Sequence, residues 1–141
     1  MPKPILVHEA LTRSVIGGFY AVYNELGYGL LEAGHRNALE AELESRRHSV
    51  AREVAFIVRY KGKPIALQRI DMIIDGKLVV EIKSTEKLAQ SAHRQLLSYL
   101  KASELEVGLL LHFGPEAKFH RQVLSEHHRR RARPSEKLTS D

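Results

Sequence analysis

The sequence predicts an α/β domain with a mixed central sheet and flanking helices, in the order α-α-β-β-β-α-β-β. Helical and alternating hydrophobic patterns occur in separate segments, with two helical patterns before the first strand pattern and a third between later ones. A continuous apolar run at residues 107–112 follows the third helical pattern. Such a run is typical of a buried strand that is reached by a crossover connection, which makes the sheet mixed.

The composition is that of an ordinary globular domain. The 141 residues are 43% hydrophobic and 28% charged, with a formal net charge of +5 that permits a polyanionic partner without demanding one. The absence of cysteine excludes disulfides and thiolate metal sites. No apolar run reaches the roughly 20 residues of a membrane span, and the N-terminus has no signal-peptide pattern. We therefore expect a cytoplasmic protein with no membrane partner.

The first helix is expected over residues 12–26, with Thr12 as a plausible N-cap. Apolar residues recur in this segment at helical spacing. Gly17 and Gly18 weaken the helix by up to about 1 kcal/mol each, so we expect them to permit close approach to another element.

A second helix is expected over residues 31–47. Leu31, Leu39 and Leu43 define its inward face. Glu32 lies in the first turn, where the helix dipole stabilises a carboxylate, and capping alone would explain it. The functional alternative is that Glu32 projects from the helix towards a site on the sheet.

Three strands follow as an antiparallel meander. Residues 50–60 alternate apolar and polar side chains, as in a half-buried strand, and a turn at 61–64 leads into the next strand. Residues 69–83 then form two strands joined by a tight turn at Asp75-Gly76, the strongest short-range hairpin signal.

This hairpin contains an unusual set of charges, Asp71 on one strand and Glu81 with Lys83 on the other. Burying them is costly unless they pair or bind a metal, although an exposed surface pair is the simpler alternative. A two-residue loop would turn Asp71 away from Glu81. A three-residue loop at 74–76, or a bulge, would place all three charges on one face.

A third helix is expected over residues 86–102, with Ser84 or Thr85 as its N-cap. Gln95 and Tyr99 stand one turn apart on a mostly apolar stripe of this helix. They are either boundary positions with a tyrosine that reaches solvent, or polar groups that face the charged hairpin.

The last expected elements are the buried strand at 107–112 and a short edge strand at 118–124, which alternates apolar and polar residues. We expect one domain over residues 1–125 and a basic, disordered tail over 126–141. The tail is either solvated or in loose electrostatic contact with a polyanion.

Two motifs resemble those of a known nuclease superfamily. Asp71, followed after nine residues by the triplet at 81–83, Glu-Ile-Lys, resembles the signature of the PD-(D/E)XK nuclease superfamily, whose core is α-β-β-β-α-β. Gln95 and Tyr99 resemble the QxxxY element of its RecB-type and λ-exonuclease-like branch. The resemblance implies a restriction-endonuclease-like core.

A third motif, Gly-Leu-Leu-Glu-Ala-Gly-His at residues 29–35, is similar to the one that names the GxxExxY, or GxxExxR, proteins of the same superfamily. Glu32 matches the glutamate of that motif, whereas His35 stands where the motif has Tyr or Arg. The three motifs occur in the order of the superfamily and cover roughly residues 11–124.

The resemblance implies a metal-dependent nuclease that hydrolyses phosphodiester bonds, with DNA expected rather than RNA. Oxygen ligands of this kind suit Mg²⁺, or Mn²⁺ as a substitute. The expected ligands are Asp71, Glu81, the backbone carbonyl of Ile82, and Glu32. Lys83 would orient or deprotonate the attacking water and stabilise the transition state, while Gln95 and Tyr99 would position the substrate or Lys83. Without metal, the repulsion among three carboxylates should raise at least one pKa.

Two other functions remain open. A catalytically inactive protein of the same fold would bind nucleic acid or a protein partner. A metal hydrolase that uses histidine ligands is less favoured, because the eight histidines show no convincing ligand spacing. A homo-oligomer is plausible, and the sheet edges and the Gly17-Gly18 helix are the first places to look for its interface.

Overall fold

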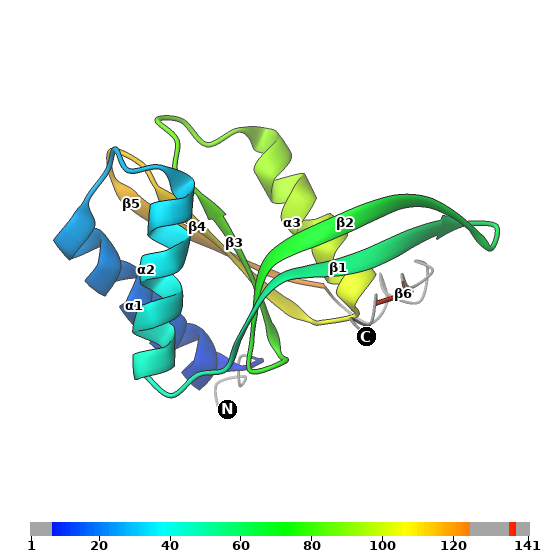
Figure 1. Ribbon diagram of the computed structural model, residues 1–141, viewed down its shortest axis with the longest axis horizontal. Helices are drawn as coiled ribbons and strands as arrows, with labels where there is room; N and C mark the ends of the chain where they lie inside the picture. The colour runs from blue at the N-terminus through cyan, green and yellow to red at the C-terminus, as the bar shows by residue number, and fades with distance from the viewer. Residues whose placement is uncertain (1–6, 125–135, 138–141) are drawn as a thin grey trace, which may run out of the picture.

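The computed structural model describes residues 7–124 and 136–137, in which helices pack on both faces of a mixed sheet (Figure 1). The helices are α1 (Glu9–Leu26), α2 (Glu32–Ser45) and α3 (Gln90–Ser103). The strands are β1 (Val50–Tyr60), β2 (Lys63–Ile74), β3 (Leu78–Lys83), β4 (Val107–Phe113), β5 (Ala117–Val123) and β6 (Glu136–Lys137).

The strand order is β5-β4-β3-β2-β1-β6. β1, β2 and β3 form the expected antiparallel meander, α3 crosses over to β4, which is parallel to β3, and β5 runs antiparallel at the edge. The predicted fold class and element order are confirmed. Within the stretch expected to be a disordered tail, only Glu136–Lys137 are described, and they pair with Phe56 and Ile57 of β1. The rest of that prediction lies outside the described residues.

Two hydrophobic clusters form, one on each face of the sheet. α1 and α2 cover one face, where Phe19 and Leu43 pack with sheet residues such as Val80. α3 covers the other face, where Leu96 packs with residues such as Val79. Because successive residues of a strand point to opposite faces, Val79 and Val80 belong to different clusters. The buried sheet is thus held between two helical layers.

The first helix begins earlier than predicted. α1 starts at Glu9, so Thr12 is inside the helix and its hydroxyl donates to the carbonyl of His8 at 2.8 Å; the prediction of Thr12 as N-cap was wrong. A Cβ placed on Gly18 would lie 3.0 Å from a methyl group of Leu43. The expected close approach at this glycine is therefore confirmed, and the element that approaches is α2.

The starts of the other two helices also differ from the prediction. Leu31 precedes α2 in an extended conformation and is 84% exposed, so it is not part of the inward face. α3 begins at Gln90, four residues later than predicted, and neither Ser84 nor Thr85 caps it. These two residues belong instead to the loop between β3 and α3, where their polar groups have other partners.

β1 and β2 extend well beyond the rest of the sheet. β3 pairs with β2 only at Met72–Ile74, whereas β1 pairs with β2 as far as the turn at Lys61 and Gly62. We call residues 54–70 the β1–β2 arm. Figure 1 shows it projecting away from the three helices, and its inner end contacts α3 through a 2.6 Å hydrogen bond from Gln68 to Ser98.

The packing of α3 on β4 depends on the absence of a side chain at Gly108. A Cβ there would lie 2.7 Å from a methyl group of Leu96, which is fully buried. We expect Gly108→Ala to lower the free energy of unfolding by about 1–3 kcal/mol, as overpacking does in other cores. Urea unfolding measured by circular dichroism tests this.

The matched control for that substitution is Gly34→Ala in α2, where the nearest atom to an added Cβ lies 3.9 Å away. It should leave stability unchanged or raise it by about 0.5–1 kcal/mol, since alanine is the better helix former. Equal unfolding midpoints for the two variants would contradict the close packing described at Gly108.

Candidate active site

The register of the β2–β3 hairpin brings the predicted acids together. Ile74 pairs with Leu78 and Met72 with Val80, so the loop has three residues, 75–77. A loop with an odd number of residues is what places Asp71 on the same face as Glu81. The observed loop has three residues, as that arrangement requires, but it lies one residue later than the predicted loop at 74–76. Beyond the last pair, the next positions along the two strands are Asp71 and Glu81, which therefore face each other.

The main-chain ladder between β2 and β3 stops at this point. A carboxylate oxygen of Asp71, Oδ2, accepts a hydrogen bond from the backbone N–H of Ile82 at 2.9 Å. The N–H and C=O of one strand residue point towards the same neighbouring strand. The carbonyl of Ile82 is therefore directed to the same gap that contains the Asp71 carboxylate.

Glu81 is the most buried acid of the site, with 3% of its surface exposed. Its Oε1 lies 3.4 Å from the ammonium nitrogen of Lys83, while no N–H group or hydroxyl of the described residues donates to its buried Oε2. Burial, followed by the negative charge of Asp71, raises the pKa of Glu81 to about 8, and Lys83 acts in the opposite direction. The site thus holds an acid pair that retains a proton near neutral pH.

Arg36 of α2 connects this pair to Glu32. Its guanidinium donates to Glu32 at 2.5 Å, and its Nε lies 3.5 Å from Oδ1 of Asp71. Burial lowers the pKa of Arg36, but the charges of Asp71 and Glu32 outweigh this and raise it above the ordinary value. The other oxygen of Glu32 accepts from the backbone N–H of Ser84 at 3.2 Å.

Glu32 therefore comes close to the site without joining the two acids. In the part of the chain that the structure describes, no three His, Asp or Glu side chains are grouped so that they could hold a metal ion. The structure brings Asp71, Glu81 and Lys83 together, and Arg36 stands between Asp71 and Glu32.

Gln95 and Tyr99 of α3 lie on the side of the acid pair opposite to Arg36. Tyr99 is 6% exposed, and its pKa is raised to about 12 by burial and by the charges of Glu81 and Asp71. A hydrogen bond with Gln95 acts in the opposite direction. Tyr99 consequently keeps its hydroxyl proton near the two acids. A cavity of about 200 Å³ is lined by Lys83, Gln95, residues of the β3–α3 loop and the first turn of α3.

His35 has a structural position that the sequence did not reveal. Its ring is fully buried, stacks on Phe113 with 4.0 Å between ring centroids, and shares hydrogen bonds with the Ser84 hydroxyl at 2.6 Å and the Gly27 carbonyl at 2.9 Å. It thus ties the start of α2 to the end of β3. Its neighbour Arg36 was not predicted as a site residue, although its i, i+4 spacing from Glu32 was a usable signal.

Comparison with solved structures supports the fold described above. The crystal structure of SSO0001 is similar with a TM-score of 0.54 and 24% sequence identity, over 88% of this chain and 64% of that one, so the chain spans under two thirds of that protein's length. At this identity the likeness shows the fold. A search of curated proteins finds no match. Among the described helices, none is long and apolar enough to cross a membrane.

The family model of the PD-(D/E)XK nuclease superfamily matches residues 9–124, which include every element from α1 to β5. The match also includes the acid pair, Lys83, and the residues of α2 and α3 that surround them. The chain belongs to the PD-(D/E)XK nuclease superfamily.

Proposed function

We propose that the protein is a nuclease that hydrolyses phosphodiester bonds of DNA and depends on a divalent metal, Mg²⁺ or, as a substitute, Mn²⁺. Its superfamily suggests a nucleic-acid substrate and generally uses divalent metals. The main support is the buried Oε2 of Glu81: when both acids are ionised, no hydrogen-bond donor among the described residues reaches it, and it lies beside a second carboxylate, that of Asp71. A buried, unpartnered carboxylate oxygen is costly, and a cation removes that cost.

The oxygen donors at the gap fit a hard divalent ion. Asp71, Glu81 and the carbonyl of Ile82 would hold it, and Glu32 would join them once its contact with Arg36 is released. When bound, such an ion stabilises negative charge on the phosphate and lowers the pKa of a water molecule. The two acids would then be fully ionised, as ligands must be.

The other side chains have roles that follow from their positions. Lys83 is held near Glu81 with 27% of its side chain exposed, so its ammonium group can reach a phosphate and offset the charge that develops on it. Lys83 would also orient the attacking water or accept its proton. Gln95 and Tyr99 would position the nucleic-acid backbone with N–H and O–H donors.

The finer assignments are part of the same proposal. We place the chain in the GxxExxY group on the motif at 29–35, and in the QxxxY-containing branch on Gln95 and Tyr99. A cytoplasmic location and a homo-oligomeric state remain predictions. Gly18 is already covered by α2, which leaves the sheet edges and the β1–β2 arm as candidate contacts between copies.

One observation favours a second candidate, a protein of this fold that binds nucleic acid without cleaving it. The guanidinium of Arg36 lies against Asp71 and Glu32, where it partly replaces the charge of a metal ion. In an inactive protein, Arg36 would be a permanent substitute for the cation. In a nuclease it would be displaced, which the long distance of 3.5 Å between its Nε and Oδ1 of Asp71 permits.

The nuclease prediction is tested with purified protein, duplex and single-stranded DNA, and Mg²⁺ or Mn²⁺. We expect cleavage by the wild type, and a loss of about 10²–10³-fold in rate for Lys83→Ala, which removes one group that stabilises transition-state charge. Lys77→Ala, an exposed cation in the hairpin turn, is the matched control and should cleave like the wild type. Equal cleavage by all three proteins would indicate a contaminating enzyme.

The role of Arg36 separates the two candidates. If Arg36 is displaced by metal, Mn²⁺ should raise the melting temperature of the wild type, and more so that of Arg36→Gln, because the competing charge is gone. The second candidate would be supported by a wild type that does not cleave DNA and whose melting temperature does not change with millimolar Mn²⁺, while Mn²⁺ raises that of Arg36→Gln.

The raised pKa of Glu81 predicts how stability changes with pH in the metal-free protein. The pKa is about 8 in the folded state against 4.5 ordinarily, so between these values the folded protein holds a proton that the unfolded chain has released. Raising the pH from 5 to 8 should therefore favour unfolding, at most by about 1.4 kcal/mol per unit of pKa difference. The glutamine side chain of the Glu81→Gln variant cannot titrate, so this variant should not lose free energy of unfolding in this way.

Urea unfolding of both proteins in EDTA, at pH values between 5 and 8, provides the measurement. The free energy of unfolding of the wild type should fall relative to that of Glu81→Gln as the pH rises. Glu116→Gln, at an exposed carboxylate, controls for the loss of one acid and should parallel the wild type. Parallel curves for the wild type and Glu81→Gln would contradict the proton-sharing acid pair.

A further inference from the structure

Positive charge is concentrated on the elements that flank the acid pair. Residues 54–70, the β1–β2 arm, contain four cations and no acid: Arg59, Lys61, Lys63 and Arg69. α3 contains two cations and no acid: Arg94 and Lys101. By contrast, α1 and α2 together contain six glutamates and two arginines. Since Arg69 precedes Asp71 by two residues and Arg94 adjoins Gln95, these two basic segments start at the site itself.

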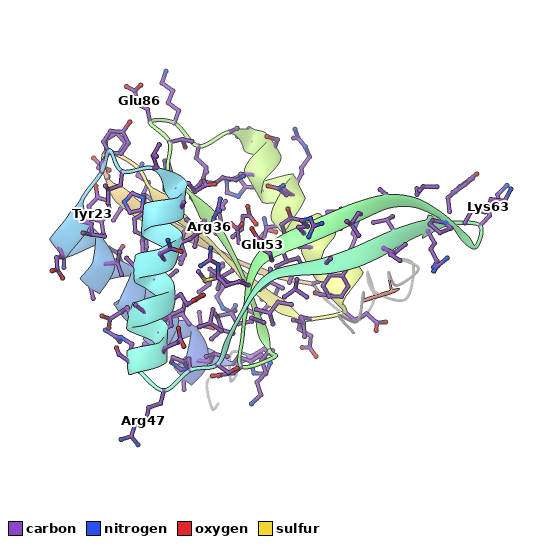
Figure 2. The ribbon with its side chains drawn as sticks, viewed as in Figure 1. Tyr23, Arg36, Arg47, Glu53, Lys63 and Glu86 are labelled. Carbon is purple, nitrogen blue, oxygen red and sulfur yellow. The ribbon has the colours of Figure 1, made fainter. Side chains whose placement is uncertain are left out.

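The far end of the arm is open to solvent. Tyr60 is 60% exposed and Ile65 is 62% exposed, whereas Phe56, nearer the body, is 5% exposed. Figure 2 shows Lys63 at the tip, far from the helices. Within the described residues neither Lys61 nor Lys63 has an acidic partner, and the ammonium group of Lys61 lies 5.3 Å from the ring centroid of Tyr60.

We propose that the outer part of the β1–β2 arm, beyond the pairing of β6 with Phe56 and Ile57, is a two-stranded ribbon that enters the major groove of a B-form DNA duplex while the acid pair acts on its backbone. This inference rests on the proposed function and assigns duplex DNA as the substrate. The major groove of B-DNA, about 12 Å wide, admits a two-stranded β-ribbon. The major groove of an A-form RNA helix is deep and too narrow for side chains to read, so duplex RNA does not fit.

The length of the arm sets where it meets the duplex. Lys63 is eight residues from Asp71 along β2, which at about 3.3 Å per residue corresponds to about 26 Å. At about 3.4 Å per base pair, an arm aligned with the duplex axis places its tip up to about eight base pairs from the reacting bond. The tip cations therefore contribute to affinity only when the duplex extends that far on the arm side.

The test measures binding without chemistry, by fluorescence anisotropy of a labelled duplex in EDTA. Loss of two phosphate contacts in the double variant Lys61→Ala, Lys63→Ala should weaken binding about 10–100-fold and reduce the slope of log K against log salt by about 2. The control Arg13→Ala, Lys77→Ala removes the same charge from exposed positions off the arm, and its affinity should change less than about threefold.

A series of duplex lengths supplies a readout that a structural effect of the substitutions would not reproduce. The wild type should lose affinity when the duplex on the arm side is shortened below about eight base pairs, whereas the tip variant should be insensitive to that change. The charge-reversed variant Lys61→Glu, Lys63→Glu should bind more weakly still. A duplex RNA of the same sequence should bind wild type and tip variant alike.

Equal affinities for the tip variant and the control, at every duplex length, would overturn the proposal. So would a finding that the arm joins two copies of this chain, with Ile65→Ser, Leu67→Ser converting a dimer into a monomer while the tip variant binds DNA normally. The nuclease proposal fails separately, if metal produces no cleavage while tip-dependent binding persists.

Discussion

The carboxylate of Asp71 replaces a main-chain partner of β3, and the remaining features of the site depend on this substitution. Because Asp71 accepts the hydrogen bond of the Ile82 N–H, the β2–β3 ladder ends at the pairing of Met72 with Val80. A side chain in the place of a backbone strand keeps the two strands apart. The separation gives room beside Glu81, and it also frees β2 to leave the sheet with β1 as the arm.

The same contact places two acidic groups in a buried gap, and the described residues compensate their negative charge only in part. Arg36 lies 3.5 Å from Asp71 and Lys83 lies 3.4 Å from Glu81, distances at which attraction is present but hydrogen bonding is poor. When both acids are ionised, one oxygen of Glu81 has no hydrogen-bond donor in the part of the chain that the structure describes. A purely structural ion-pair network would normally satisfy every buried oxygen. This missing hydrogen-bond donor is the physical reason to propose that a cation binds in the gap.

The sequence predicted the order of elements and the meeting of Asp71 with Glu81, because both follow from periodicity and from the cost of burying unpaired charge. Helix starts were predicted less well. Thr12 and Ser84 have the chemistry of caps, but Thr12 bonds back to the preceding turn and the N–H of Ser84 serves Glu32, 52 residues away. The position of Arg36 against Asp71 could not be foreseen either, since no local pattern relates α2 to β2. The roles of Gln95 and Tyr99 remain predictions.

Because β2 diverges from β3 and continues into the arm, the arm and the site are connected by a single strand. Asp71 and the tip of the arm belong to the same continuous strand, so in the proposed complex the distance between the reacting phosphate and the groove contact would be set by strand length and not by a flexible linker. A linker would allow the basic tip to hold DNA in many registers, whereas a strand allows few. Apart from Asp71, the charged residues of β2 are all cations, so this strand attracts a polyanion along its length. Its one negative charge, that of Asp71, lies at the proposed site of hydrolysis.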